Sequence, residues 1–161
     1  FANIHDEIPS KLLMIGDGPE RTKAESLCRE LGISDAVRFL GKLEAVEEVL
    51  SVADLFLMPS EKESFGLAAL EAMACEVPVI SSNTGGIPEL NVQGVTGFMS
   101  PVGDVEDMTQ KALFVLDKAN LPGFKANALK RAQEFDITRI LPLYEDYYQR
   151  IMEKTASKAT I

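Results

Sequence analysis

The sequence predicts an α/β protein, built on a doubly wound parallel sheet that is followed by C-terminal helices. In its first part, short apolar runs alternate with segments of helical periodicity, which is the pattern of strands joined by right-handed helical crossovers. Several runs are apolar throughout, as is typical of strands covered on both faces. After Pro101 the strand pattern stops and amphipathic segments follow, so the sheet is expected to precede a set of helices.

Clear turn signals separate the first predicted elements. Residues 1–8 resemble the end of a helix, and the apolar run 11–15 is a strand that stops at a Gly-Asp-Gly-Pro turn. The proline of that turn suits the start of a helix over 19–31, which Gly32 closes as a C-terminal cap. The next predicted elements are a strand at 37–40, a helix at 46–52 and a strand at 55–58.

The remaining elements complete the sheet and add the helices. Three amphipathic helices are expected at the end of the chain, and Pro142 should kink or restart the last of them. The predicted elements are a helix at 65–75, a strand at 78–81, a turn at 85–86, a strand at 97–99, and helices at 105–119, 124–135 and 137–151.

The length of 161 residues suits one domain. We expect this domain to span 1–161, with a helix end at 1–8, sheet and helices in 11–100, C-terminal helices in 104–153 and a weakly patterned tail in 154–161.

Composition excludes several classes of protein. The net charge of −9 argues against a nucleic-acid binder, because backbone binding needs clustered cations. No apolar run approaches the roughly 18 residues of a membrane span, and no signal-peptide pattern opens the chain. Cys28 and Cys75 are too few for a disulfide framework, which favours a reducing cytoplasm. Because His5 is the only histidine, neither a Ser-His-Asp triad nor a His-based metal site can be assembled, and no metal is expected.

The loop after the strand at 55–58 is the richest candidate site, since open parallel sheets bind ligands beyond the carboxyl ends of their strands. Ser64 is a natural N-cap for the helix that follows, and Gly66 leaves room for a ligand to approach the backbone. The helix start is a ready anion site, because its first N–H groups lack intrahelical partners. On this prediction they belong to Phe65, Gly66 and Leu67.

Two carboxylates accompany this anion site. Glu71 follows Ser64 by seven residues and so returns to nearly the same helix face, about 10 Å along the axis. There it could accept hydrogen bonds from vicinal hydroxyls, as on a ribose. Glu63, just before the cap, points toward the same crevice. The alternative interpretation is that these carboxylates and Glu61 are solvated surface charges.

Two glycine-containing turns have alternative roles. Gly85-Gly86 could form a backbone wall against a bound sugar or phosphate, or a plain strand-to-helix turn with Pro88 as the first helical residue. The turn with Gly16 and Gly18 invites comparison with a dinucleotide-binding fingerprint, but Arg21 stands where the third glycine is required. We interpret it as a turn near a ligand and not as an NAD site.

The segment from Glu63 to Glu71 stands among several other short motifs in a fixed order. Those motifs are Gly16-Asp17-Gly18-Pro19, Val37-Arg38-Phe39-Leu40-Gly41, Ala53-Asp54, Pro59-Ser60, Gly85-Gly86-Ile87-Pro88-Glu89 and Gly94-x-x-Gly97. Together they resemble the retaining, nucleotide-sugar-dependent glycosyltransferases of the two-Rossmann-domain (GT-B) type, family 4, with Glu63 and Glu71 as the Glu-x7-Glu signature. The resemblance covers 11–150 and is greatest to members that join N-acetylglucosamine to L-malate in bacillithiol synthesis.

The resemblance implies a role for each site residue. Glu63 would be the catalytic residue that binds the donor sugar near its reacting carbon, and Glu71 would bind the ribose hydroxyls. The sugar would transfer with retained configuration, by front-face attack in which the leaving phosphate helps to deprotonate the acceptor. The other implied donor-binding residues are Ser64, Phe65, Gly66 and Leu67 at the diphosphate, Gly16 and Gly18 at the crevice, and Arg38, Phe39 and Leu40 at the base.

The implied donor is a UDP-sugar, N-acetylglucosamine being the expected sugar, bound without metal or other cofactor in a cytoplasmic enzyme. The Arg and Lys that bind the phosphates in this family are missing here, and so is the family's acceptor-binding N-terminal domain. We therefore expect an inactive donor-nucleotide half of a parent enzyme that could form a homodimer. Two alternatives are a stand-alone nucleotide-binding or signalling module and half of a related sugar-nucleotide epimerase or phosphorylase. A signalling module of the receiver type would need an acidic cluster at the ends of its first strands, and Asp17 and Glu20 do not form that pattern. A phosphorylase would need a cofactor lysine, and none is located in the sequence.

Overall fold

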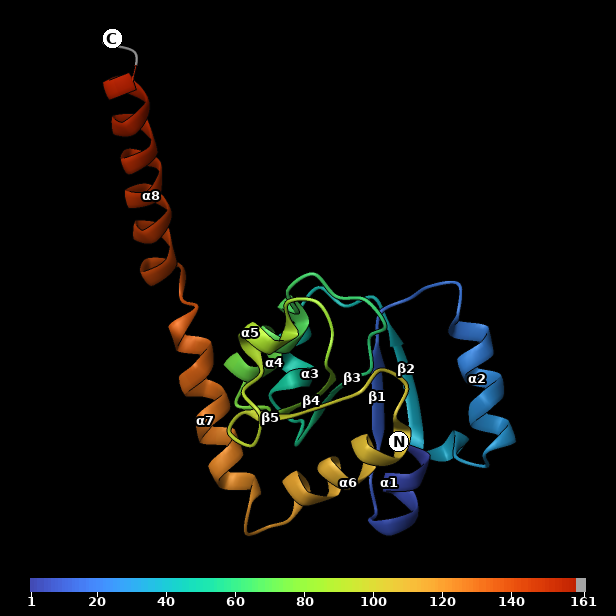
Figure 1. The fold of residues 1–161 in the computed structure, drawn as a ribbon. Helices are drawn as coiled ribbons and strands as arrows, with labels where there is room; N and C mark the ends of the chain where they lie inside the picture. The colour runs from blue at the N-terminus through green and yellow to red at the C-terminus, as the bar shows by residue number, and fades with distance from the viewer. Residues whose placement is uncertain (159–161) are drawn as a thin grey trace.

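The computed structural model describes residues 1–158 and has parallel strands with helices around them (Figure 1). The predicted α/β class is confirmed. The strands form two sheets and not one continuous ladder, because within the described residues β1 and β3 do not pair with each other. One sheet has the order β1-β2 and the other β3-β4-β5, with β1 (Leu12–Ile15), β2 (Val37–Gly41), β3 (Phe56–Met58), β4 (Val79–Ser82) and β5 (Gly97–Ser100).

Helices precede, connect and follow these strands. In Figure 1, α1 and α6 lie together at one end of the sheets, and α8 projects away from both sheets. The helices are α1 (Ala2–Glu7), α2 (Arg21–Glu30), α3 (Val46–Leu50), α4 (Leu67–Ala74), α5 (Ile87–Leu90), α6 (Val105–Leu116), α7 (Leu121–Glu134) and α8 (Ile137–Lys158), with a 3-10 turn at Ser34–Ala36.

β4 forms the centre of the core and is buried over its whole length. Successive side chains of a strand point to opposite faces, so Val79 and Ile80 of β4 belong to different hydrophobic clusters. Val79 packs in the cluster that contains Met73 of α4, and Ile80 packs in the cluster that contains Ile4 of α1 and Val115 of α6. The first cluster holds α4 against the three-stranded sheet and thereby sets the position of its N-terminus.

The helix after β1 begins two residues later than predicted. Its N-cap is Glu20, and Arg21 is its first residue. The Gly18 N–H donates to the Asp17 carboxylate (3.0 Å), and the Gly18 carbonyl accepts from the Arg21 N–H (3.1 Å). These bonds form a turn that includes Pro19, so the proline lies in the turn and not in the helix.

The three C-terminal helices are present with shifted ends. α6 stops at Leu116, because Asp117 has an extended backbone (φ −59°, ψ 133°). α8 is a single helix that contains Pro142, so the proline does not restart it. The same helix passes the predicted boundary at 153 and reaches Lys158, and residues 159–161 of the predicted tail lie outside the described part of the chain.

Candidate functional site

The loops that follow the strands gather at one end of the molecule. Strands within each sheet are parallel, and the loops after β1, β2 and β3 lie together at the top of Figure 1. Ligands of open α/β sheets bind at this carboxyl end. The candidate site is therefore built from the loop 59–66, the start of α4, the turn 83–86 and the end of the β1–β2 sheet.

Ser64 does not cap α4, contrary to the sequence prediction. The N-cap is Gly66, which has a left-handed backbone (φ 98°, ψ 46°), and the helix begins at Leu67. The Ser64 carbonyl accepts a hydrogen bond from the Gly86 N–H (3.1 Å), so Ser64 is held by the neighbouring turn. An α-helix leaves its first N–H groups without intrahelical partners, and here these belong to Leu67, Ala68 and Ala69. Of the predicted diphosphate-binding amides, that of Leu67 is in this group, that of Gly66 belongs to the N-cap residue, whose N–H also has no intrahelical partner, and that of Phe65 precedes the helix.

The glycine at this helix start is required by packing inside the protein. A Cβ on Gly66 would lie 2.7 Å from Cδ1 of Ile87 and 3.6 Å from Cε of Met58, and the left-handed backbone also favours glycine. Ile87 thus occupies the space that the sequence analysis assigns to an approaching ligand. The Phe65 ring packs against Phe135 with a centroid distance of 5.6 Å. Phe65 therefore packs toward the core through Phe135, whereas Glu61, Lys62 and Ser64 of the same loop are exposed.

Glu63 and Glu71 occupy different environments at this end. Glu63 is half-buried, and its Oε1 accepts hydrogen bonds from the Ser64 N–H (2.9 Å) and the Ser64 hydroxyl (3.4 Å). Glu71 is exposed on α4, four residues after Leu67, so both lie on one face, about 6 Å apart along the axis. Leu67 is itself 66% exposed. The arrangement can present an apolar surface, a row of N–H donors and a carboxylate acceptor to one ligand.

A second group of predicted residues meets at the end of the β1–β2 sheet. The Gly16 N–H donates to the Gly41 carbonyl (2.7 Å), which brings the two strand ends together. A Cβ on Gly16 would meet nothing within 4 Å, so this end of β1 borders open space. Phe39 is half-buried and Leu40 is exposed beside it. Because successive side chains of a strand point to opposite faces, one of these two side chains, the aromatic Phe39 or the aliphatic Leu40, can contact the flat face of a base.

Arg21 is a candidate site residue that sequence reasoning misses, because its position only marks the break in a glycine fingerprint. Its guanidinium lies 5.6 Å from the Phe39 ring centroid, a distance suited to a cation–π contact. The Arg21 Nε donates to Glu25 (2.9 Å), and a terminal nitrogen lies 3.9 Å from Asp17. The available signal was its place at the first turn of a helix that follows a strand, where side chains reach the carboxyl end of the sheet.

One predicted residue, Arg38, is not brought into this group. Arg38 pairs with Leu13 near the start of β2, so it lies about 10 Å before Gly41 along the strand. Its guanidinium donates to the Val37 carbonyl (3.1 Å). Gly18 is part of the turn before α2 and is exposed. The structure thus separates Arg38 from the Gly16–Gly41 contact.

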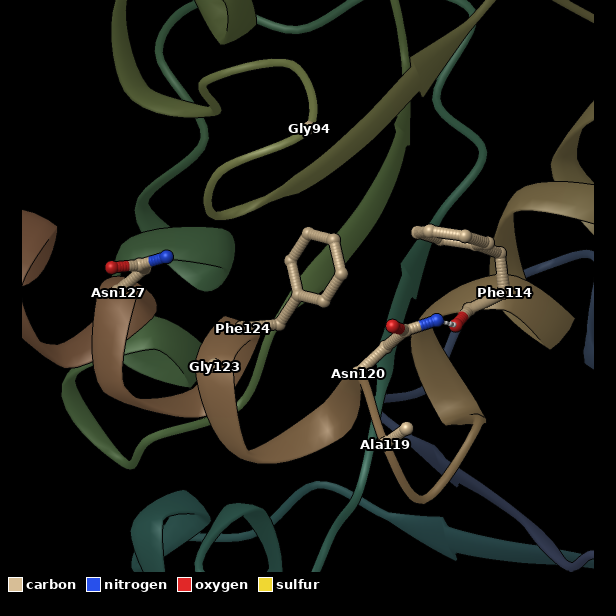
Figure 2. A pocket seen from close by; sticks show the side chains of 7 residues that line it. All are labelled: Gly94, Phe114, Ala119, Asn120, Gly123, Phe124 and Asn127. Atoms are coloured by element: carbon tan, nitrogen blue, oxygen red, sulfur yellow. Dashed lines mark hydrogen bonds between the residues drawn. The ribbon is translucent and has the colours of Figure 1, made fainter.

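A cavity in the described part of the chain lies elsewhere. It has a volume of about 340 Å³ and lies between the chain before β5 and the α6–α7 connection, at the amino ends of the strands. Figure 2 shows the Phe114 and Phe124 rings at this cavity and the Asn120 amide, which donates to the Phe114 carbonyl (2.8 Å). This cavity is therefore not part of the candidate site.

Over residues 1–158, no three His, Cys, Asp or Glu side chains are grouped so that they could hold a metal ion.

Comparisons with known proteins show the family of this chain. Residues 1–133 match the family described as Glycosyl transferases group 1. The chain is 43% identical over 157 residues to N-acetyl-alpha-D-glucosaminyl L-malate synthase of Bacillus anthracis, covering 94% of this chain and 40% of that protein. Because the family match extends over most of the chain, the protein belongs to this family of glycosyltransferases.

Solved structures extend the similarity to three dimensions. Sucrose-phosphate synthase from Thermosynechococcus elongatus superposes with a TM-score of 0.84 at 30% identity, over 95% of this chain and 41% of that one. The Anabaena protein HepE in complex with UDP superposes with a TM-score of 0.77 at 26% identity, over 97% of this chain and 44% of that one. The chain thus spans less than half the length of these relatives. Within residues 1–158, no helix is both long enough and apolar enough to cross a membrane.

Proposed function

We propose that this chain is the donor-binding half of a retaining glycosyltransferase that transfers N-acetylglucosamine from UDP-N-acetylglucosamine to L-malate. One observation carries the proposal: Glu63 and Glu71 lie on either side of the first turn of α4, at the carboxyl end of the sheet. A diphosphate needs N–H donors, and the sugars on its two sides need hydroxyl acceptors. The 43% identity to the Bacillus anthracis malate synthase supports the choice of sugar and acceptor.

Each part of the donor has a matching group at this site. The N–H groups of Leu67, Ala68 and Ala69 face the diphosphate, where the helix dipole also favours negative charge. Glu71 accepts hydrogen bonds from the ribose hydroxyls, and the base lies against the Phe39 end of β2. Glu63 accepts a hydrogen bond from a hydroxyl of the donor sugar near its reacting carbon. The UDP complex of HepE, which shares this fold, supports a uridine nucleotide as the ligand.

The reaction needs no nucleophile from the protein. The bond between the anomeric carbon and the diphosphate oxygen breaks, and the malate hydroxyl oxygen bonds to that carbon from the same face. The hydroxyl proton goes to the departing diphosphate oxygen. The protein contributes by holding donor and acceptor in this arrangement and by stabilising the charge on the diphosphate. We propose that no metal takes part.

The other half of the site comes from the remainder of the enzyme. The chain covers 40% of its Bacillus anthracis relative, so we propose that an N-terminal domain binds malate and that the segment next to this chain supplies the phosphate-binding Arg and Lys. The net charge of −9 fits this division, because cations are then contributed from outside the chain. Two free cysteines and a UDP-sugar donor fit a cytoplasmic location.

The test is a transfer assay with the full-length enzyme, UDP-N-acetylglucosamine and L-malate. Replacing Glu71 by Ala should raise the KM for the donor about tenfold, because a charged acceptor of two hydroxyls is lost. Glu63→Gln should lower kcat by about 100-fold, because the sugar is no longer oriented. Exposed Glu48 on α3 gives the matched control Glu48→Ala, which should behave as wild type. A product with inverted anomeric configuration, or a donor KM unchanged in Glu71→Ala, would contradict the proposal.

A further inference from the structure

We propose that Thr84, Gly85 and Gly86, which we call the 84–86 turn, are positioning residues that fix the orientation of the Glu63 carboxylate by direct contact of the two backbones. This inference rests on the proposed function, in which Glu63 orients the donor sugar. In this role the glycines do not form a wall against a ligand, and they do more than connect β4 to α5.

Two hydrogen bonds join the 84–86 turn to the loop that carries Glu63. The Thr84 hydroxyl donates to the Glu61 carbonyl (3.2 Å), and the Gly86 N–H donates to the Ser64 carbonyl (3.1 Å). Glu63 lies between these two acceptors in the sequence. The loop is therefore held on both sides of the residue whose position matters for the reaction.

Gly85 and Gly86 allow the two segments to touch through their backbones. A Cβ on Gly85 would lie 1.6 Å from the Glu63 carbonyl oxygen, and a Cβ on Gly86 would lie 2.3 Å from the Ser64 carbonyl oxygen. The φ of Gly85 is +55°, while that of Gly86 is −85° and open to any residue. Glycine at 86 is thus required by the close approach alone, and glycine at 85 by both approach and conformation.

The contact reaches the carboxylate through a single peptide group. The peptide bond between Glu63 and Ser64 is planar, and its carbonyl oxygen is the atom that faces Gly85. Its N–H, at the opposite edge of the same plane, donates to Oε1 of Glu63 (2.9 Å). Any rotation of this peptide group that relieves a contact at Gly85 therefore also moves the N–H that orients the carboxylate.

The core beneath the 84–86 turn makes this arrangement rigid. Ile87, directly after the turn, is 1% exposed and packs in the cluster that contains Met73 of α4. The Ile87 side chain also fills the space at Gly66, at the other end of the loop. The turn cannot retreat without disturbing that cluster, so a side chain added at Gly85 must displace Glu63 instead.

The test compares two variants of the full-length enzyme, Gly85→Ala and Gly103→Ala. Both glycines have a positive φ, but only a Cβ added at Gly85 would clash with another segment. Gly103 has φ +80° and nothing within 4 Å of a Cβ, so Gly103→Ala carries the conformational strain without the contact. We expect Gly103→Ala to keep wild-type kcat. We expect Gly85→Ala to lower kcat by about 30-fold with a smaller change in donor KM, as misplacement of a catalytic group by a fraction of an ångström would do. Equal kcat values for the two folded variants would overturn the inference.

A spectroscopic measurement separates this inference from the proposed function. With 15N-serine labelling, the Ser64 amide shift should depend on the Glu63 carboxylate: Glu63→Gln should change it in the wild-type and in the Gly103→Ala background, because the N–H donates to that carboxylate. In Gly85→Ala this dependence should be lost. If the enzyme does not transfer N-acetylglucosamine but the amide result holds, the proposed function fails and the positioning contact stands. Retention in Gly85→Ala of the dependence of the Ser64 shift on the Glu63 carboxylate would refute the contact.

Thr84→Val provides a variant for the case in which Gly85→Ala does not fold. It removes the hydrogen bond to the Glu61 carbonyl while it keeps the shape of the side chain. We expect an unchanged melting temperature within a few degrees and a kcat lowered about threefold to tenfold, in line with the loss of one hydrogen bond. A wild-type kcat in Thr84→Val would count against the 84–86 turn as a positioning element.

Discussion

The two sheets of this protein are built from similar apolar runs but are buried very differently. All four residues of β4 are buried, whereas Leu13 and Met14 of β1 are 40% and 38% exposed. Every residue of α2 is exposed or half-buried, while α4 buries Ala69, Ala72 and Met73. Burial thus follows the number of neighbours that each strand has and not its own hydrophobicity.

This difference divides the candidate site into two parts. The Glu63 loop and the start of α4 stand on the packed three-stranded sheet, and Gly86 and Ile87 hold them from the side. The Gly16 and Phe39 end stands on the two-stranded sheet, whose strands lie outside both hydrophobic clusters of the described residues. We therefore expect the diphosphate part of the site to be rigid and the base part to be more mobile.

The largest effect should come from side-chain truncation in the two sheets. Ile80→Ala removes a fully buried side chain from β4 and should lower the free energy of unfolding by about 4 kcal/mol. Leu13→Ala, at a 40% exposed position of β1, should cost about 1 kcal/mol, because less apolar area is lost. Urea denaturation followed by circular dichroism measures both. Similar losses for the two variants would remove the distinction between the sheets.

A buried amide gives the next largest effect. Nδ2 of Asn91 shares its two hydrogens among three acceptors, the Val79 carbonyl (3.2 Å), the Ser81 hydroxyl (3.0 Å) and the Phe98 carbonyl (3.2 Å), and so joins β4 to β5. Asn91→Ala leaves these acceptors buried and should cost about 3 kcal/mol in urea denaturation. In α2, the exposed Ser26 hydroxyl accepts from Arg29 (2.8 Å), and Ser26→Ala should change stability by less than about 0.5 kcal/mol. A small loss for Asn91→Ala would mean that the second sheet does not depend on this connection.

A third prediction concerns ligand binding at the less buried sheet. Phe39→Ala should weaken UDP binding to the full-length enzyme about tenfold, because the base loses its aromatic contact. The same change should alter stability less than Ile80→Ala, since Phe39 lies outside the core clusters of the described residues. Isothermal titration calorimetry measures the affinity. UDP binding that is unaffected by Phe39→Ala would place the base elsewhere.

The smallest effect is electrostatic and concerns an ion pair of α6, which packs beside the β3-β4-β5 sheet. The Lys111 ammonium hydrogen-bonds to Asp107 and lowers the pKa of that carboxyl below its usual 3.8, while it also donates to the Met99 carbonyl of β5 (2.8 Å). Because the folded-state pKa is lowered, the ionised carboxylate stabilises the fold above about pH 4 and loses this contribution as the pH falls through the folded-state pKa. Asp107→Asn should therefore cost less than about 1 kcal/mol at pH 7. In urea denaturation at several pH values, the difference from wild type should shrink toward pH 2; a constant difference would exclude this ion pair as its source.

Much of the fold follows from local pattern in the sequence. The apolar runs identify the five strands to within a residue or two, and Gly32 closes α2 as its position suggests. The start of α4 could not be found in this way, because Ser64 has the chemistry of an N-cap and lies at the right distance from the apolar face. Its carbonyl is engaged by Gly86, twenty-two positions later in the chain, and local sequence does not report such a contact.

The glycines at the candidate site show the same division. Their presence in short motifs marks the segments 59–71 and 83–89 as parts of the candidate site. The reason for each glycine is a contact in the folded chain. Gly66 faces the Ile87 side chain, Gly85 faces the Glu63 carbonyl and Gly86 faces the Ser64 carbonyl. A turn against a ligand and a turn against another backbone need the same residue type, so composition cannot tell them apart.

Residue order and periodicity were therefore enough to indicate the α/β class, the run of elements and the carboxyl end as the place of the site, because hydrophobic spacing and turn residues act over a few positions. The division into two sheets and the start of α4 at Leu67 depended on the folded chain. The same is true of the separation of Arg38 from Gly41 and of the contact between the 84–86 turn and Glu63. They arise from strand pairing and close packing between distant segments, whose free energies are set by which surfaces meet and not by any local stretch of sequence.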